Sequence, residues 1–522
     1  MTVVDSTGDA RVRRRWVVAA TTAVVLYAIV SLVFVFRGRL NADEGWYLYA
    51  GKLVFRGKLP YRDFAFPQMP LSAYTYGVSQ LFGTSLRVGR VMSLGFGVAA
   101  VVLCVRVAWR EAGRAAGVAV AVLCLAFPTG IYNLTLTKTY AISAFLLAAV
   151  LFALTSPGRP ARTWPLATAA AIALTATRTT GLSITVLVVL FCVVRAPDRA
   201  TRHRVFGVSA VGGGILAAFL LADVSAAKYD LVTFHNLLWY GAPGRTRLDT
   251  IVRDRLPDWL ENYAGYVALS VAAIAAVYLS KPLRAYLARQ PGVAIVGLGI
   301  ATALASQLVA GEWAPVEYAS PVIPALITVT IVMLGVALRP AGGWGERRGI
   351  AVAAGVAVAA LAISTIVHPG FTEYLTEPGD AGSITNTNEL GDFLRAHTRD
   401  GDEILALWAQ PAAYASGRDE VPGVTVGPFS YEDLTTKRAR DLHYVNADLL
   451  RNMLRSRRPA AVVITGIDHT ILGSTGTFSN VPADPQRVLS VLESGYHLAH
   501  RTTGYGIDGP IPFDVYLRND RK

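Results

Sequence analysis

Long apolar segments are the feature that most constrains how this chain can fold. Of its 522 residues, 53% are apolar and only 16% are charged. Many of the apolar runs are near twenty residues long, the length that crosses a hydrocarbon core of about 30 Å. Spans are expected at about 16–36, 88–108, 115–131, 140–154, 165–178, 181–194, 206–224, 262–280, 292–310, 320–338 and 349–367. The sequence therefore predicts a polytopic α-helical membrane protein with about eleven transmembrane helices.

The distribution of basic residues predicts the orientation. Arg11, Arg13, Arg14 and Arg15 precede the first apolar run, which is too long for a signal-peptide core. We therefore expect this run to stay as an anchor, with the N-terminus in the cytoplasm and the protein in the cytoplasmic (inner) membrane. Further basic residues lie in alternate connections between spans, so the net charge of +13 reflects orientation. Nucleic-acid binding is not expected.

The composition changes near His368 to that of a soluble domain. Helical patterns at about 387–398, 446–457 and 484–494 interleave with strand-like runs. These runs are Glu403–Trp408, Ala460–Thr465, His497–Thr502 and Phe513–Leu517. Such alternation predicts a small α/β domain. We expect residues 1–368 to form the transmembrane module and residues 369–522 an extracytoplasmic α/β domain, because an odd number of spans leaves the C-terminus outside.

The first outer loop, residues 37–87, holds two adjacent carboxylates at the start of a predicted helix. Asn41 can cap this helix, and Glu44 stands where a capping-box acid reaches back. The apolar residues between Trp46 and Val54 recur on one side, which predicts a helix lying on the membrane surface. Leu71–Phe82 is predicted to be a second surface helix. The preference of acids for a helix N-terminus is an alternative explanation of Asp43 and Glu44.

Polar residues gather at the outer ends of the predicted spans. They are Asp43, Glu44, Asp63, Arg87, Arg90, Lys138, Arg178, Lys228, His235 and Arg245. An isolated arginine at a span end is often a snorkelling anchor. Arg178, however, stands between threonines on the outer side, where orientation does not require positive charge. A lipid phosphate in the outer leaflet would need such a partner.

These features together resemble the GT-C class of integral-membrane glycosyltransferases, which take a sugar from a polyprenyl-phosphate carrier. Relatives include protein O-mannosyltransferases and the lipid A aminoarabinose transferases. The resemblance rests on the acidic loop Ala42–Tyr47, the surface helices, the segment Phe82–Arg90 before the second span, and the exterior C-terminal domain. A departure is Glu317, which stands before Tyr318 where many relatives have a basic residue.

The resemblance implies roles for Asp43, Lys138 and Arg178, and the positions of the other polar residues suggest roles for them. Asp43 and Glu44 are the expected catalytic residues, with Asp43 as the base and Glu44 supporting the loop or binding the acceptor. The residues expected to bind the donor phosphate are Lys138, Arg178 and Arg90. The residues expected to line the donor or acceptor cleft are Tyr61, Asp63 and His235. No metal-ligand spacing is present, so no metal site or cofactor is predicted, and the use of a divalent metal stays open.

The chemistry of glycosyl transfer fits these residue types. An acceptor hydroxyl that attacks an anomeric carbon must lose a proton, which a carboxylate within about 3 Å can take. The departing lipid phosphate needs cationic partners. The sequence thus favours an inverting transferase that moves a monosaccharide from a polyprenyl-phosphate donor to an extracytoplasmic glycan, lipid or protein.

Two other functions are consistent with a polytopic chain. A transporter or flippase of lipid-linked sugars would keep ionisable groups near the bilayer midplane, whereas these spans are mostly free of charge at their centres. A receptor-like protein could bind glycan through its C-terminal domain, but about eleven spans are excessive for an anchor. The acidic outer loop favours the transferase.

Overall fold

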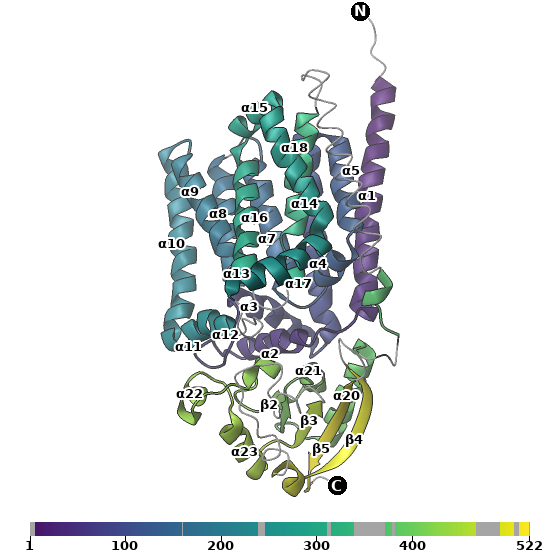
Figure 1. Cartoon of the computed structure of the whole chain (residues 1–522), viewed down its shortest axis with the longest axis vertical. Helices are drawn as coiled ribbons and strands as arrows, with labels where there is room; N and C mark the ends of the chain where they lie inside the picture. The colour runs from purple at the N-terminus through teal and green to yellow at the C-terminus, as the bar shows by residue number, and fades with distance from the viewer. Residues whose placement is uncertain are drawn as a thin grey trace, which may run out of the picture.

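Helices stand side by side in a bundle, and a domain built on a β-sheet lies against one end of that bundle (Figure 1). The computed structural model describes residues 6–158, 160–237, 246–310, 315–338, 371–377, 380, 382–465, 491–505 and 511–520. We call the end of the bundle next to the sheet its sheet-side end. The strands and helices between Ile384 and Arg518 are called the sheet domain.

The bundle is made from the long apolar helices. They are α1 Ser6–Arg37, α4 Leu86–Ala112, α5 Arg114–Leu125, α7 Thr139–Thr155, α8 Pro160–Thr177, α9 Gly181–Val194, α10 Arg199–Ala222, α14 Leu256–Leu279, α16 Pro291–Ala310 and α18 Ile323–Ala337. Among the described residues, 5 helices are long and apolar enough to cross a membrane, and shorter apolar helices stand beside them. Each of the first ten predicted spans overlaps one bundle helix. The predicted span 349–367 lies outside the described residues, so the count of about eleven stays a prediction.

Short helices gather at the sheet-side end. They are α2 Asp43–Phe55, α3 Leu71–Gly77, α6 Pro128–Asn133, α11 Val224–Lys228, α12 Phe234–Leu237, α13 Arg247–Thr250 and α17 Pro315–Tyr318. A π-helical turn, Tyr229–Thr233, joins α11 to α12. The seven residues of α3 extend about 10 Å, too short to span a bilayer, and a 3₁₀ turn, Val78–Phe82, completes the predicted surface helix.

Helix α2 is buried on almost every side, so the prediction of a helix with one apolar stripe on an open membrane surface is wrong. It lies between the bundle and the sheet domain (Figure 1), and ten of its residues are buried. Two glycines permit this close packing. A Cβ atom at Gly45 would lie 2.6 Å from the nitrogen of Pro411, and one at Gly51 would lie 2.9 Å from the nitrogen of Gly77. Both faces of α2 are therefore packing faces.

The sheet has five strands in the order β2-β1-β3-β5-β4. The strands are β1 Glu403–Ala406, β2 Asp419–Glu420, β3 Ala461–Thr465, β4 Tyr496–Tyr505 and β5 Ile511–Arg518. Strand β1 pairs in parallel with β2 and β3, whereas β5 pairs antiparallel with β3 and β4. The four predicted strands are present, and β2 is too short to show a period in sequence. The associated helices are α20 Ile384–His397, α21 Gln410–Ser416, α22 Thr436–Asp441 and α23 Ala447–Arg455.

Helix α2 is fastened to the edge of the sheet. The Lys52 ammonium donates to the carbonyl of Gly417 at 3.0 Å and pairs with Asp419 on β2 at 2.9 Å. The hydroxyl of Tyr49 accepts a hydrogen bond from the backbone nitrogen of Glu420 at 2.9 Å. Because Lys52 is almost fully buried, these contacts hold the first outer loop and the sheet domain together.

We predict that the sheet-side end lies outside the cytoplasm. Lys58, in the first outer loop, and Lys437, on α22, are exposed on the sheet side. Lys281 begins α15 (Lys281–Arg289) at the opposite end of the bundle (Figure 1). An impermeant thiol reagent should label Lys58→Cys and Lys437→Cys in intact cells, but Lys281→Cys only after permeabilisation. Native Cys104, Cys124 and Cys192 are buried and should give little background. The reverse pattern would invert the orientation.

Candidate active site

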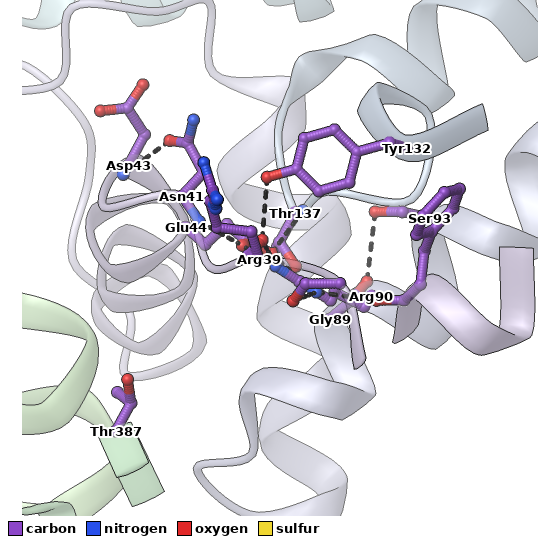
Figure 2. Close-up of polar contacts among 12 residues, drawn as sticks. Arg39, Asn41, Asp43, Glu44, Gly89, Arg90, Ser93, Tyr132, Thr137 and Thr387 are labelled. Carbon is purple, nitrogen blue, oxygen red and sulfur yellow. Dashed lines mark hydrogen bonds and ion pairs between the residues drawn. The ribbon is translucent and has the colours of Figure 1, made fainter. Parts of the chain in front are cut away.

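The two adjacent carboxylates at the start of α2 point in different directions. The side-chain oxygen of Asn41 accepts from the backbone nitrogen of Asp43 at 3.0 Å, and Glu44 Oε1 accepts from the backbone nitrogen of Asn41 at 3.1 Å. The contact from Glu44 back to Asn41 is the one expected from the sequence, but helix α2 begins at Asp43 and Ala42, the residue before it, supplies no side-chain cap. Figure 2 shows Asp43 turned away from Glu44, since consecutive residues of a helix project about 100° apart.

Glu44 forms a fully buried, two-point ion pair with Arg90. Arg90 donates from Nε to Glu44 Oε2 at 2.8 Å and from Nη2 to Oε1 at 2.6 Å, and both side chains are 0% exposed. The remaining guanidinium hydrogens point to the end of α1 and the residues after it. Their acceptors are the carbonyls of Phe34, Gly38 and Arg39, at 2.8, 2.9 and 2.8 Å. All five N–H groups of Arg90 thus have an acceptor.

This pairing corrects two sequence predictions. Arg90 has no N–H group left for a phosphate, so its predicted role in binding the donor is wrong. Glu44 Oε2 also accepts from the backbone nitrogen of Thr137 at 3.0 Å, and its carboxylate is sealed from solvent. Glu44 is therefore a positioning residue and not a catalytic one. Together the pair holds the start of α2 against α1, α4 and the segment that leads into α7 (Figure 2).

Asp43 belongs to a separate, partly exposed cluster of charges. Its Oδ2 atom lies 2.8 Å from the ammonium of Lys138, which lies 3.0 Å from Glu317 Oε1. The hydroxyl of Tyr140 donates to the same Glu317 oxygen at 2.8 Å. Burial alone would lower the pKa of Lys138, but the carboxylates of Asp43 and Glu317 raise it well above its usual value. Lys138 is therefore a permanent cation beside Asp43.

Arg178 also contacts Tyr140. Its guanidinium carbon is 5.3 Å from the ring centre of Tyr140 and 4.9 Å from that of Tyr318. Its Nη1 atom donates to the hydroxyl of Thr139 at 3.1 Å. These contacts hold the guanidinium while its charge is retained. Lys138 and Arg178, both predicted from the sequence to bind phosphate, thus lie near the same tyrosine ring.

An apolar pocket runs from Arg178 into the bundle. Its walls include Leu147 of α7, Ile184 of α9 and Leu304 of α16, with Arg178 and Tyr318 among the polar lining, and its volume of about 20 Å³ has room for about one water molecule. These leucine and isoleucine residues come from within bundle helices, whereas Arg178 follows the end of α8. An amphiphile with an anionic head at Arg178 could place its apolar chain here only if the helices around the pocket move apart.

Tyr61 and Asp63 shape the first outer loop. The buried hydroxyl of Tyr61 donates to the carbonyl of Gln68 at 2.7 Å. Asp63 accepts from the backbone nitrogen of Leu59 at 2.7 Å, and its ion pair with Arg62 holds its pKa below the usual value. Among the described residues, neither side chain bonds to Asp43 or Lys138. These contacts give both residues a role in loop conformation, and their lining of the donor or acceptor cleft stays a prediction.

His235 and Asp230 attach the loop from the segment after α10. His235 Nε2 lies 2.8 Å from the carbonyl oxygen of Pro67, and burial lowers its pKa to about 4, so the imidazole is neutral. The buried carboxylate of Asp230 accepts from the nitrogen of Phe66 at 2.7 Å and the hydroxyl of Tyr444 at 2.8 Å. Burial raises the pKa of Asp230 to about 7. Asp230 was not predicted from the sequence, where its only signal is an acid among mostly apolar neighbours.

The remaining polar residues do not join the Asp43 cluster. Lys228 is exposed on α11, and Arg87 stacks on the ring of Phe36 with 5.6 Å between guanidinium carbon and ring centre. Arg245 lies outside the described residues. Within the described part of the chain, no three side chains of histidine, cysteine, aspartate or glutamate gather as a metal site would require.

The buried ion pair leads to a stability prediction. Arg90→Met should lower the free energy of unfolding by about 3–5 kcal/mol, because it leaves the Glu44 carboxylate buried and unpaired. The double variant Glu44→Gln/Arg90→Met should recover part of this loss, since no buried charge remains. Arg87→Met, one turn earlier, is the matched control and should cost about 1 kcal/mol or less. Thermal unfolding in detergent measures all three, and equal losses for Arg87→Met and Arg90→Met would contradict the assignment.

Comparison with known proteins identifies the fold. No family model matches the sequence, and no curated protein matches it. The structure of ArnT from Cupriavidus metallidurans bound to undecaprenyl phosphate is similar, with a TM-score of 0.58 at 13% identity over 96% of this chain and 98% of that one. The Archaeoglobus fulgidus oligosaccharyltransferase gives a TM-score of 0.50 at 13% identity over 95% of this chain and 74% of that one. The chain is thus a membrane protein with the GT-C fold predicted from its acidic outer loop.

Proposed function

We propose that this protein is an inverting glycosyltransferase that moves a monosaccharide from a polyprenyl-phosphate donor to an acceptor outside the cytoplasm. One observation carries the proposal. The partly exposed carboxylate of Asp43 lies 2.8 Å from Lys138, and Arg178 contacts the same Tyr140 ring as Lys138 and lines a small apolar pocket. A carboxylate, two cations and an apolar pocket between helices thus meet at one end of the bundle.

Lys138 and Arg178 are proposed to hold the donor phosphate. Cationic groups stabilise the charge that develops on a departing phosphate, and a planar guanidinium can grip two phosphate oxygens. The pocket beside Arg178 would take the first part of the polyprenyl chain once the helices around it move apart. The similar ArnT structure has undecaprenyl phosphate bound, which supports a ligand of this class.

Asp43 is proposed to take the proton of the acceptor hydroxyl. The acceptor oxygen forms a bond to the anomeric carbon as the bond from that carbon to the phosphate oxygen breaks, and polyprenyl phosphate leaves. A single displacement inverts the anomeric centre. Because Lys138 now shares its charge with Asp43, a bound phosphate that draws this ammonium toward itself would leave Asp43 a stronger base. Donor binding would thereby prepare the base.

The proposed arrangement places the transmembrane module in residues 1–368 and an extracytoplasmic domain in residues 369–522. The acceptor would be a glycan, lipid or protein that reaches Asp43 from the side of the sheet domain. The charged cluster of Asp43, Lys138 and Glu317 lies where α2, α7 and α17 meet at the sheet-side end, not midway along the bundle helices. This position favours a transferase over a transporter, whose ionisable groups lie near the midplane.

The first test removes the base. Asp43→Asn is nearly isosteric and should lower turnover by about 10²- to 10⁴-fold without weakening donor binding. The measurement is release of polyprenyl phosphate from a panel of polyprenyl-phosphate sugars, per folded molecule. Asp63→Asn is the matched control, because Asp63 bonds within the loop, and it should retain most activity. Turnover by Asp43→Asn above about a tenth of wild type would exclude Asp43 as the base.

The second test addresses the phosphate. Arg178→Lys keeps the charge but loses the planar fork, so binding of undecaprenyl phosphate should weaken in this variant and weaken further in Arg178→Ala. The control is Arg195→Ala, which replaces an exposed arginine just after α9 and should bind undecaprenyl phosphate as wild type does. Equilibrium binding in detergent micelles gives the comparison. If both Arg178 variants bind as wild type, Arg178 is an anchor and not a ligand.

A further inference from the structure

Glu317 already occupies the hydrogen-bond donors that the proposed phosphate would need. One carboxylate oxygen, Oε1, accepts from the Lys138 ammonium at 3.0 Å and from the Tyr140 hydroxyl at 2.8 Å. Asp43 is a second carboxylate paired with Lys138, at 2.8 Å. An ammonium has three hydrogens and a phenol has one. One hydrogen of Lys138 and the single one on Tyr140 are therefore committed to Glu317, and the charge of Lys138 is shared with Asp43.

The charges of the cluster also balance before any donor arrives. Asp43 and Glu317 supply two negative charges, and Lys138 and Arg178 supply two positive charges. A phosphodiester donor brings one more negative charge into a partly dry site. If Glu317 leaves the cluster, the remaining three groups carry one net positive charge, which balances the single negative charge of the donor. Charge neutrality therefore favours replacement of the Glu317 carboxylate by the donor phosphate over addition of the phosphate to the intact cluster.

Glu317 is the partner that can withdraw. Its side chain is 23% exposed, whereas that of Lys138 is 3% exposed and is enclosed at the start of α7. Glu317 lies on α17, a helix of only four residues, and a carboxylate there has water to move into. Asp43, by contrast, stands on a helix fixed by the Glu44–Arg90 pair. Glu317 is therefore the carboxylate that the donor phosphate can displace from Lys138.

We infer that Glu317 is an internal substitute for the donor phosphate: it holds Lys138 and Tyr140 in the empty site, the donor phosphate displaces it, and its return helps expel the product. The inference rests on the proposed function, because it assumes that Lys138 receives a phosphate. The product, polyprenyl phosphate, is a monoester whose second pKa is near 6, so it carries about 1.5 to 2 negative charges near neutral pH. Such an anion would leave slowly from two cations unless another anion replaced it.

The test is the affinity for undecaprenyl phosphate in detergent micelles. Glu317→Gln keeps the size of the side chain and removes its charge, so it should bind about threefold to tenfold more tightly than wild type, the range expected for a partly exposed charge pair. Glu317→Ala should also bind more tightly, which guards against a special effect of the amide. Glu373→Gln removes the charge of an exposed glutamate after the bundle and should bind as wild type.

The outcomes separate this inference from the proposed function. Tighter binding by both Glu317 variants, with Glu373→Gln unchanged, supports it. Equal or weaker binding by folded Glu317→Gln and Glu317→Ala, while Arg178→Ala weakens binding, overturns the inference and leaves the proposed function standing. Absence of binding by wild type overturns both. A turnover assay adds a second readout: Glu317→Gln should show a lower KM together with a lower kcat if return of the carboxylate speeds product release, whereas mere loss of structure would lower kcat alone.

Discussion

The structure depends on one dry ion pair, that between Glu44 and Arg90. Burying two charges is costly, and such a pair is tolerated when every donor and acceptor is used. Here the guanidinium satisfies carbonyls at the end of α1 as well as Glu44, and Glu44 also receives the backbone nitrogen of Thr137. Four separate segments of the chain therefore meet at one point. Asp43 directly precedes Glu44 in the chain. The Glu44–Arg90 pair therefore sets the position of Asp43, although Asp43 takes no part in that pair.

Two neighbouring carboxylates of the same chemistry thus acquire opposite environments. Glu44 is sealed and permanently paired, whereas Asp43 is partly exposed and shares a cation that Glu317 also contacts. The difference follows from helical geometry, since adjacent side chains project about 100° apart. One faces the packed junction of α1 and α4, and the other faces the cleft. Two adjacent acids can therefore differ in burial and pairing whenever the two sides of their helix face different surroundings.

Sequence periodicity was sufficient for the bundle helices and for four strands, because these patterns are local. Asp43, Lys138 and Arg178 could be named because they stand at the outer ends of predicted spans, where the orientation of the chain does not require charge. The pairing of Glu44 with Arg90 could not be found, since it joins residues 46 positions apart and a buried arginine looks like an anchor in sequence. The burial of α2 on both faces was also hidden, because its second face packs on α21, more than 300 residues later in the chain. Asp230 could not be predicted for the same reason, because its hydrogen-bond donors lie in two distant segments of the chain.

Helix α2 is attached at both ends to different bodies, and this has a mechanical consequence. Its first turn is pinned to the bundle by Arg90, while Tyr49 and Lys52 fix its later turns to the edge strand β2. Thirteen residues of helix form a stiff rod about 20 Å long. Under the proposed function, an acceptor that pulls on the sheet domain would act first on the later turns of this rod, where Tyr49 and Lys52 are bound. Asp43 lies at the other end, next to the Glu44–Arg90 pair, so the proposed base is the part of the helix that such a pull would move least.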